Sequence, residues 1–163
     1  MNNLHHYKTN VTWTGNRGDG TLEYKGYDRN HTISVSNKPA ILASSDAAFM
    51  GDAERYNPEE LFLASLSSCH MLWYLHLCAE HGIVVTAYTD LATGSLDEHH
   101  VNGGKFTEVM LHPHVTVAQS SMIAKANEIH ELAGEKCFIA NSCNFPVKHH
   151  PVCKVEFKVN AGV

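Results

Sequence analysis

Positive charge is scarce in this sequence and is spread thinly. Its 163 residues include 12 Lys or Arg against 17 Asp or Glu, which gives a formal net charge of -5. No basic stripe is present that could neutralise a run of phosphates, so a nucleic acid is not an expected partner. Repeats and low-complexity tracts are also missing, which leaves an ordinary globular protein.

A signal peptide and a clear membrane span are missing too. The N-terminal sequence MNNLHHYKTNVTW lacks a charged-then-apolar pattern, and the most apolar stretch, residues 61–77, carries serines and histidines. The hydrophobic content of 44% is enough to bury a core without metals or disulfide staples. We therefore expect a single domain over residues 1–163, in a cytoplasmic protein with no membrane partner.

The sequence has no CxxC pair, and its cysteine count is odd. In a reducing compartment, thiols at this density do chemistry, bind metal or pack in a core more often than they staple a fold. The search for function therefore starts with the five cysteines, which are Cys69, Cys78, Cys137, Cys143 and Cys153.

The N-terminal third has the pattern of a small antiparallel sheet. Strands are predicted around Val11 and Trp13, over residues 21–27 and over residues 31–35, because turn-rich GNRGDG and YDRN separate these stretches. Residues 37–56 are rich in Ser, Ala, Pro and Gly without clear periodicity, and predict a long connection.

The clearest local signal is a helix that starts after Asn57. Asn57 is a good N-cap, Pro58 suits the first helical position, and Gly82 suits the position after the end. The sequence between them, LFLASLSSCHMLWYLHLCA, is apolar or small on nearly every face. This composition is typical of a helix that is buried in a core or an interface.

The C-terminal half predicts a hairpin, a helix and a strand. IVVTAYTDLATGSL and KFTEVMLHPHVTV flank a polar turn and form the hairpin, with Pro113 expected at an edge or bulge. VCKVEFKV alternates like a half-buried final strand. The fold class is therefore α+β. The helix is predicted over residues 119–133, with one apolar stripe made of Met122, Ala126, Ile129 and Ala133.

The five thiols differ in their expected roles. Cys69 and Cys78 lie nine residues apart on one helix, on opposite faces and about 13.5 Å apart along the axis, so they cannot pair. Cys78 and Cys153 are expected in the core as small hydrophobes. Cys137 follows the second helix at a turn that could present a thiol, whereas Cys143 could be either buried or functional.

Three motifs in order carry a family resemblance. WTGNRGDGT, YNPEELFLASLSSCHMLWYL and CFIANSCNFPV together resemble the OsmC/Ohr family of organic hydroperoxide reductases, and especially its OsmC-like branch. The resemblance covers almost the whole chain. It implies an OsmC-like fold, an intertwined homodimer, and a cysteine-based peroxidase that reduces organic hydroperoxides to alcohols.

The resemblance also implies roles for individual residues. The peroxidatic cysteine falls on Cys69, and the glutamate that holds a catalytic arginine falls on Glu59. The resolving cysteine matches Cys137 better than Cys143. Gly134 departs from the family pattern, because many relatives are expected to carry His two or three residues before the resolving cysteine.

The catalytic arginine is the least determined position. The candidates are Arg17, Arg29 and Arg55, and we prefer Arg29 because YDRNH resembles the element of the OsmC-like branch. Glu59 and Cys69 are ten residues apart on one helix, about 15 Å along its axis. If both serve one active site, a second subunit must supply one of them.

The expected chemistry needs no bound cofactor or metal. An external dithiol, such as the dihydrolipoyl group of a lipoylated protein, is the reductant that the resemblance implies. Apolar neighbours of Cys69 suit an alkyl or lipid hydroperoxide, although the same residues could simply form core. They are Leu66, Met71, Leu72 and Trp73.

Two other functions stay open. The 13 histidines include pairs that could bind a metal near Cys143 or Cys153, although adjacent histidines usually diverge. A protein that kept the fold but lost the reductase activity, and binds a small ligand instead, is the second alternative. The histidine pairs are His99–His100, His112–His114 and His149–His150.

Overall fold

The computed structural model describes residues 4–99 and 103–155. Contacts divide the chain into two compact units, residues 1–62 and residues 63–163, which are described in turn. The single domain over residues 1–163 stays a prediction.

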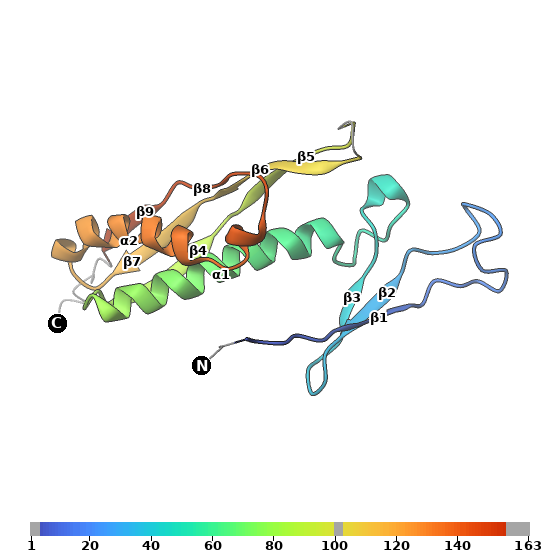
Figure 1. Cartoon of the computed structure of the whole chain (residues 1–163), viewed down its shortest axis with the longest axis horizontal. Coiled ribbons are helices and arrows are strands. Elements are labelled where there is room, and N and C mark those ends of the chain that lie inside the picture. The colour runs from blue at the N-terminus through green and yellow to red at the C-terminus, as the bar shows by residue number, and fades with distance from the viewer. Residues whose placement is uncertain (1–3, 100–102, 156–163) are drawn as a thin grey trace, which may run out of the picture. The chain divides into compact units, whose positions relative to one another are not determined.

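The first unit is built on a three-stranded antiparallel sheet with the order β1-β2-β3 (Figure 1). Among the described residues of this unit, Ala43 is the one buried hydrophobic residue, whereas Val11, Trp13 and Leu42 are exposed. The sheet therefore has almost no core of its own. Its strands are β1 (Asn10–Trp13), β2 (His31–Ser34) and β3 (Ile41–Ala43).

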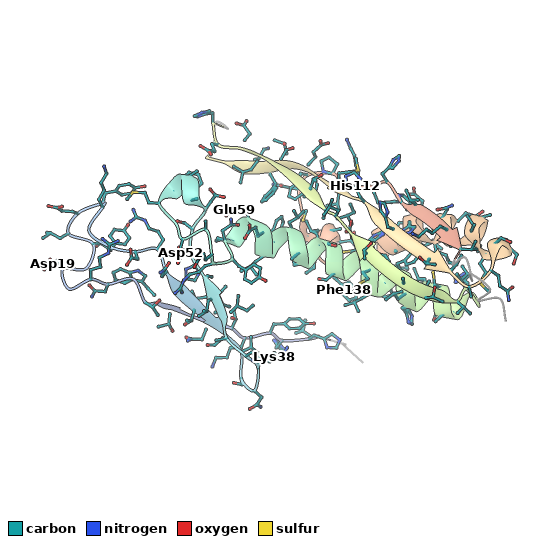
Figure 2. The ribbon with its side chains drawn as sticks, turned by 180° about the vertical axis from the view of Figure 1, so that it is seen from behind. Asp19, Lys38, Asp52, Glu59, His112 and Phe138 are labelled. Carbon is teal, nitrogen blue, oxygen red and sulfur yellow. The ribbon has the colours of Figure 1, made fainter. Side chains whose placement is uncertain are left out.

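The strand predicted over residues 21–27 is wrong. These residues form turns, one of them closed by a 2.9 Å hydrogen bond from the Gly26 N–H to the Glu23 carbonyl. Asp19 lies in the same loop, between β1 and β2 (Figure 2). The connection predicted over residues 37–56 is also more structured than expected, because it contains β3 and the short 3₁₀ helix η1 (Ala47–Phe49).

Helix α1 (Pro58–Glu80) begins and ends where the sequence predicts. The Glu60 N–H donates to Asn57 Oδ1 (2.8 Å) and the Asn57 N–H donates to Glu60 Oε2 (3.1 Å), which is a capping box. At the other end Gly82 adopts φ 69°, and the Ile83 N–H donates to the Cys78 carbonyl (2.8 Å). This Schellman arrangement needs a residue that tolerates the left-handed conformation.

The second unit contains the predicted hairpin, broken once in each arm. The outer segments β4 and β7 pair with each other, as do β5 and β6, all antiparallel. Asp90, at the end of β4, connects the two arms and α1 at this break. Its carboxylate accepts hydrogen bonds from Ser67 Oγ on α1 (2.5 Å) and from the N–H of His112, which lies between β6 and β7 (2.6 Å). The segments are β4 (Val85–Asp90), β5 (Thr93–Asp97), β6 (Lys105–Leu111) and β7 (Pro113–Val117).

Two further strands extend the hairpin. β8 (Val147–His149) runs parallel to β6, and β9 (Val152–Val155) runs parallel to β7. β9 is the predicted final strand up to Val155, and β8 was not predicted. Pro113 is in neither of its expected places, since it opens β7, the middle strand of the order β4-β7-β9. The first position of a strand tolerates proline even there.

Helix α2 (Ile123–Lys136) lies beside α1 and forms the core of this unit with it (Figure 1). The predicted stripe is confirmed at Ala126, Ile129 and Ala133, all completely buried. Short 3₁₀ helices precede and follow α2, namely η2 (Ser120–Met122) and η3 (Ala140–Ser142).

One side of α1 is buried against this core and the other is open. Leu66, Tyr74 and Leu77 are buried, whereas Leu72 is exposed. By length and composition alone α1 could also cross a membrane, a test that core helices of other proteins pass as well. An apolar helix with one uncovered side is typical of a protein interface.

Candidate active site

The structure brings Cys69 and Cys137 together. Cys69 lies on α1 and is partly exposed, whereas Cys137 is the C-cap residue of α2 and is 1% exposed. The two thiols are neighbours, close enough that the Cys69 side chain affects the pKa of Cys137. Neighbouring thiols on different elements can form a disulfide where their Cα atoms come within about 7 Å.

The turn after α2 holds Cys137 in this position. Its N–H donates to the Gly134 carbonyl (3.3 Å), its carbonyl accepts from the Asn141 N–H (3.0 Å), and its sulfur accepts from the Ala140 N–H (3.4 Å). Burial, with the neighbouring Cys69 thiol, raises the pKa of Cys137 to about 11. Cys137 is therefore a protonated thiol at neutral pH, and it needs help to become a nucleophile.

The other three cysteines are engaged elsewhere. The Cys143 thiol donates to the Ile139 carbonyl (3.2 Å), and burial raises its pKa. Cys78 is 1% exposed, which confirms its predicted core position. Cys153 packs against the same core, with its sulfur 3.9 Å from the Tyr74 hydroxyl.

An apolar surface adjoins the thiol pair. Leu72 and Phe138 have 63% and 68% of their surface exposed, and the Phe138 ring meets the Trp73 ring edge-on at 5.5 Å between centroids (Figure 2). Leu66, by contrast, is completely buried and belongs to the core. Sequence reasoning missed Phe138, although its position directly after Cys137 could have suggested it.

Arg29 belongs to the first unit, where two tyrosines surround it. Its guanidinium donates to the Tyr27 carbonyl (2.6 Å) and to the Tyr24 carbonyl (2.7 Å). It also lies over both rings, 4.2 Å from the Tyr27 centroid and 4.6 Å from the Tyr24 centroid. These contacts fix the direction of the guanidinium before any ligand binds.

The remaining charged candidates also belong to the first unit. Arg17 pairs with Asp28, and Arg55 Nε donates to Asp52 Oδ2 (3.1 Å). Glu59 lies in the first turn of α1 (Figure 2). Among the described residues it forms no ion pair, so the expected pairing of Glu59 with a catalytic arginine is not formed within this chain.

Comparison with known proteins identifies the family. A family model described as OsmC-like protein matches residues 51–150. The chain belongs to the OsmC-like family. An OsmC-like protein of unknown function from Vibrio cholerae is 32% identical, with 91% of this chain and 100% of that chain covered and a TM-score of 0.82. The predicted α+β, OsmC-like fold is thereby confirmed. No curated protein matches this chain.

Two more distant structures share the fold of this OsmC-like protein. An organic hydroperoxide resistance protein from Elizabethkingia anophelis is 20% identical, covers 96% of this chain and all of its own, and gives a TM-score of 0.67. One from Legionella pneumophila is also 20% identical, covers 93% of this chain and all of its own, and gives 0.66. Identities this low show the fold alone.

The histidine pairs do not converge on a metal site in the described part of this OsmC-like protein. Over residues 4–99 and 103–155, no group of three or more His, Cys, Asp or Glu side chains could hold a metal ion. His100 lies outside the described residues. The absence of a metal requirement stays a prediction.

A different histidine cluster, which sequence reasoning missed, packs in the second unit. The His70 and His130 rings stack at 5.3 Å and share a 3.0 Å hydrogen bond between His70 Nε2 and His130 Nδ1. His149 lies 5.4 Å from the His70 centroid. Burial, with the neighbouring His149, lowers the pKa of His70 to about 4, and burial with both neighbours lowers that of His130 to about 3.

This cluster predicts a loss of stability in mild acid. Unfolded histidines bind protons below about pH 6.5, while the buried pair resists protonation down to about 4, so the free energy of unfolding falls between these values. We expect each of the two histidines to contribute a loss of about 2 kcal/mol between about pH 7.5 and pH 5 in urea titrations, so that His130→Gln should lose about half as much as the wild type. The exposed His76→Gln is the control, and equal pH slopes in all three proteins would contradict the prediction.

Proposed function

We propose that this protein is a thiol-dependent peroxidase that reduces organic hydroperoxides to alcohols through Cys69 and Cys137. The observation that carries the proposal is the proximity of these two thiols, one on α1 and the other at the C-cap of α2. Family membership supports the same chemistry, because structural neighbours include proteins named for organic hydroperoxide resistance.

The chemistry runs in two steps. The Cys69 thiolate attacks the outer peroxide oxygen, the O–O bond breaks, and an alcohol leaves while Cys69 becomes a sulfenic acid. Cys137 then attacks the Cys69 sulfur, and water leaves as the disulfide forms. An external dithiol such as a dihydrolipoyl group restores both thiols. Cysteine chemistry of this kind suits the reducing conditions of a cytoplasm.

The active site requires a second copy of the chain. Glu59 and Cys69 are separated by ten residues of α1, about 15 Å along the axis. Glu59 therefore cannot reach the Cys69 sulfur of its own copy. In the homodimer that we propose, one copy contributes Arg29 and Glu59, and the other contributes the two thiols. The guanidinium stabilises the Cys69 thiolate by its permanent charge and hydrogen bonds.

A dimer is expected in solution. The first unit buries one hydrophobic side chain among its described residues, and the outer side of α1 is apolar and uncovered, so a second copy would bury both surfaces. Light scattering at micromolar concentration should give about twice the 18.0 kDa mass of the chain. A monomeric mass would contradict the shared active site.

A preference for organic peroxides is the direct test of the function. The purified protein should consume cumene hydroperoxide at least about tenfold faster than hydrogen peroxide, because Leu72, Trp73 and Phe138 provide apolar contacts near the thiols. Each peroxide is supplied first with dithiothreitol and then with dihydrolipoamide. No consumption with intact thiols would favour a ligand-binding protein that has lost the activity.

A further inference from the structure

A small cavity of about 160 Å³ lies beside the last turns of α2 and reaches Cys137. It is lined by side chains of α1, α2 and β8, together with Cys137 itself. Its titratable groups besides Cys137 are His70, Glu131, Glu135 and His149. A space of this size holds several water molecules, so protons can move between these groups.

His149 is held in this cavity with one orientation. Its side chain is 14% exposed, and Nε2 lies 3.2 Å from Glu131 Oε1. A carboxylate only accepts hydrogen bonds, so the neutral imidazole carries its proton on Nε2 and keeps a free lone pair on Nδ1. Nδ1 lies over Gly134, 3.8 Å from the position of a Cβ there. Gly134 in turn accepts the hydrogen bond from the Cys137 N–H.

Cys137 is the group in this cavity that needs a base. Burial and the Cys69 thiol raise its pKa to about 11, so at neutral pH it is almost entirely protonated. Only the thiolate attacks an oxidised sulfur. The guanidinium proposed for the first step is engaged at Cys69, and the cavity contains no Lys or Arg side chain that would favour a Cys137 thiolate.

We propose that His149, oriented by Glu131, is the base that accepts the Cys137 proton when Cys137 attacks oxidised Cys69. The inference rests on the proposed function, in which these two cysteines form a disulfide. Nδ1 takes the proton, directly or through a cavity water, and the Cys137 sulfur bonds to the Cys69 sulfur. The S–O bond of the sulfenic acid breaks, and the departing hydroxide takes the proton back and leaves as water.

The other histidines of the cluster are poor candidates for this role. His70 shares its Nε2 with His130, and burial lowers the pKa of His70 to about 4 and that of His130 to about 3. Weak bases of this kind cannot take a proton from a thiol effectively near neutral pH. His149 also lies nearer the surface, where Glu131 stabilises the imidazolium that forms.

The test isolates the attack of Cys137 from the reaction with peroxide. Ellman's reagent converts Cys69 to a mixed disulfide and releases one thionitrobenzoate, and attack by Cys137 then releases a second. This second release is intramolecular and independent of reagent concentration. In a Cys143→Ser background, we expect His149→Gln to slow it at least about tenfold, and Glu131→Gln to slow it about threefold. Mass spectrometry identifies the disulfide.

The pH profile separates a base from a packing residue. The rate at neutral pH should depend less steeply on pH with His149 present than in His149→Gln, where the reaction relies on ionisation of Cys137 itself, whose pKa burial raises to about 11. The groups that face His149 are His70 on α1 and His130, Glu131 and Glu135 on α2. A matched control is His150→Gln, an exposed histidine at the next position, which should leave the rate and profile unchanged.

The outcomes are distinguishable from those for the proposed function. A His149→Gln rate within about twofold of the background, or an equal loss in His150→Gln, overturns the role of His149. If His149→Gln fails to fold, Glu131→Gln carries the test, since its side chain is 80% exposed, and an unchanged rate there overturns the proposal. A protein that forms the disulfide at the normal rate but consumes no hydroperoxide contradicts the proposed peroxidase function. The same result leaves the proposed role of His149 as a base supported.

Discussion

Replacing Cys69 with serine is expected to abolish organic hydroperoxide reduction, with a loss of about a thousandfold or more in the rate of cumene hydroperoxide consumption. Cys69 is the partly exposed member of the thiol pair, whereas Cys137 is buried and protonated. A serine hydroxyl keeps the shape of the site but cannot form the nucleophile at neutral pH. The measurement is peroxide consumption with dithiothreitol in excess.

Cys78→Ser and Cys153→Ser are the matched controls for this prediction. Both thiols pack in the core beside Tyr74 and lie outside the Cys69–Cys137 pair, so most of the activity should remain. Each variant is checked for folding by circular dichroism, because a hydroxyl in the core destabilises by about 1–3 kcal/mol. Full activity in Cys69→Ser would rule out the proposed mechanism.

The parts of the fold that could be predicted from sequence are those fixed by short-range chemistry. Asn57 and Glu60 cap α1 through contacts three residues apart, and Gly82 ends it because few other residues tolerate its backbone conformation. The stripe on α2 was equally predictable, since its spacing alone defines the buried face.

The error in the N-terminal third arises where side-chain contacts override the local preference for a strand. TLEYKGY alternates like a strand, but the guanidinium of Arg29 binds the carbonyls of Tyr24 and Tyr27 and stacks on both rings, which holds the segment in turns.

β8 has three residues and gains its hydrogen bonds from β6, so its own sequence carries little signal.

The candidate site was predictable only in part. The family motifs implied that Cys69 and Cys137 pair, and this pairing stays a prediction. No periodicity could have shown that the two thiols are neighbours. The cluster of His70, His130 and His149 was missed because it combines three elements. His70 and His130 lie on the two predicted helices, whereas His149 lies on β8, which the sequence did not predict. The roles of Arg29 and Glu59 stay predictions. The mass measurement by light scattering tests them, because both roles require a second copy of the chain.

Peroxide treatment should join Cys69 to Cys137. One equivalent of cumene hydroperoxide is expected to give this crosslink as the main product in the wild type, because the two thiols are already neighbours. In Cys137→Ser the Cys69 sulfenic acid should persist and be trapped by dimedone. Peptide mapping by mass spectrometry under non-reducing conditions measures both products.

Cys143 is the alternative partner of Cys69, and its hydrogen bonding is a reason to expect little Cys69–Cys143 disulfide. Its thiol donates to the Ile139 carbonyl at 3.2 Å, so attack on Cys69 would require that hydrogen bond to break and the turn at η3 to open. Cys143→Ser should therefore form the Cys69–Cys137 crosslink at the wild-type rate. A dominant Cys69–Cys143 peptide would transfer the resolving role to Cys143. The absence of any disulfide would instead indicate a mechanism with one cysteine, in which an external thiol reduces the sulfenic acid directly.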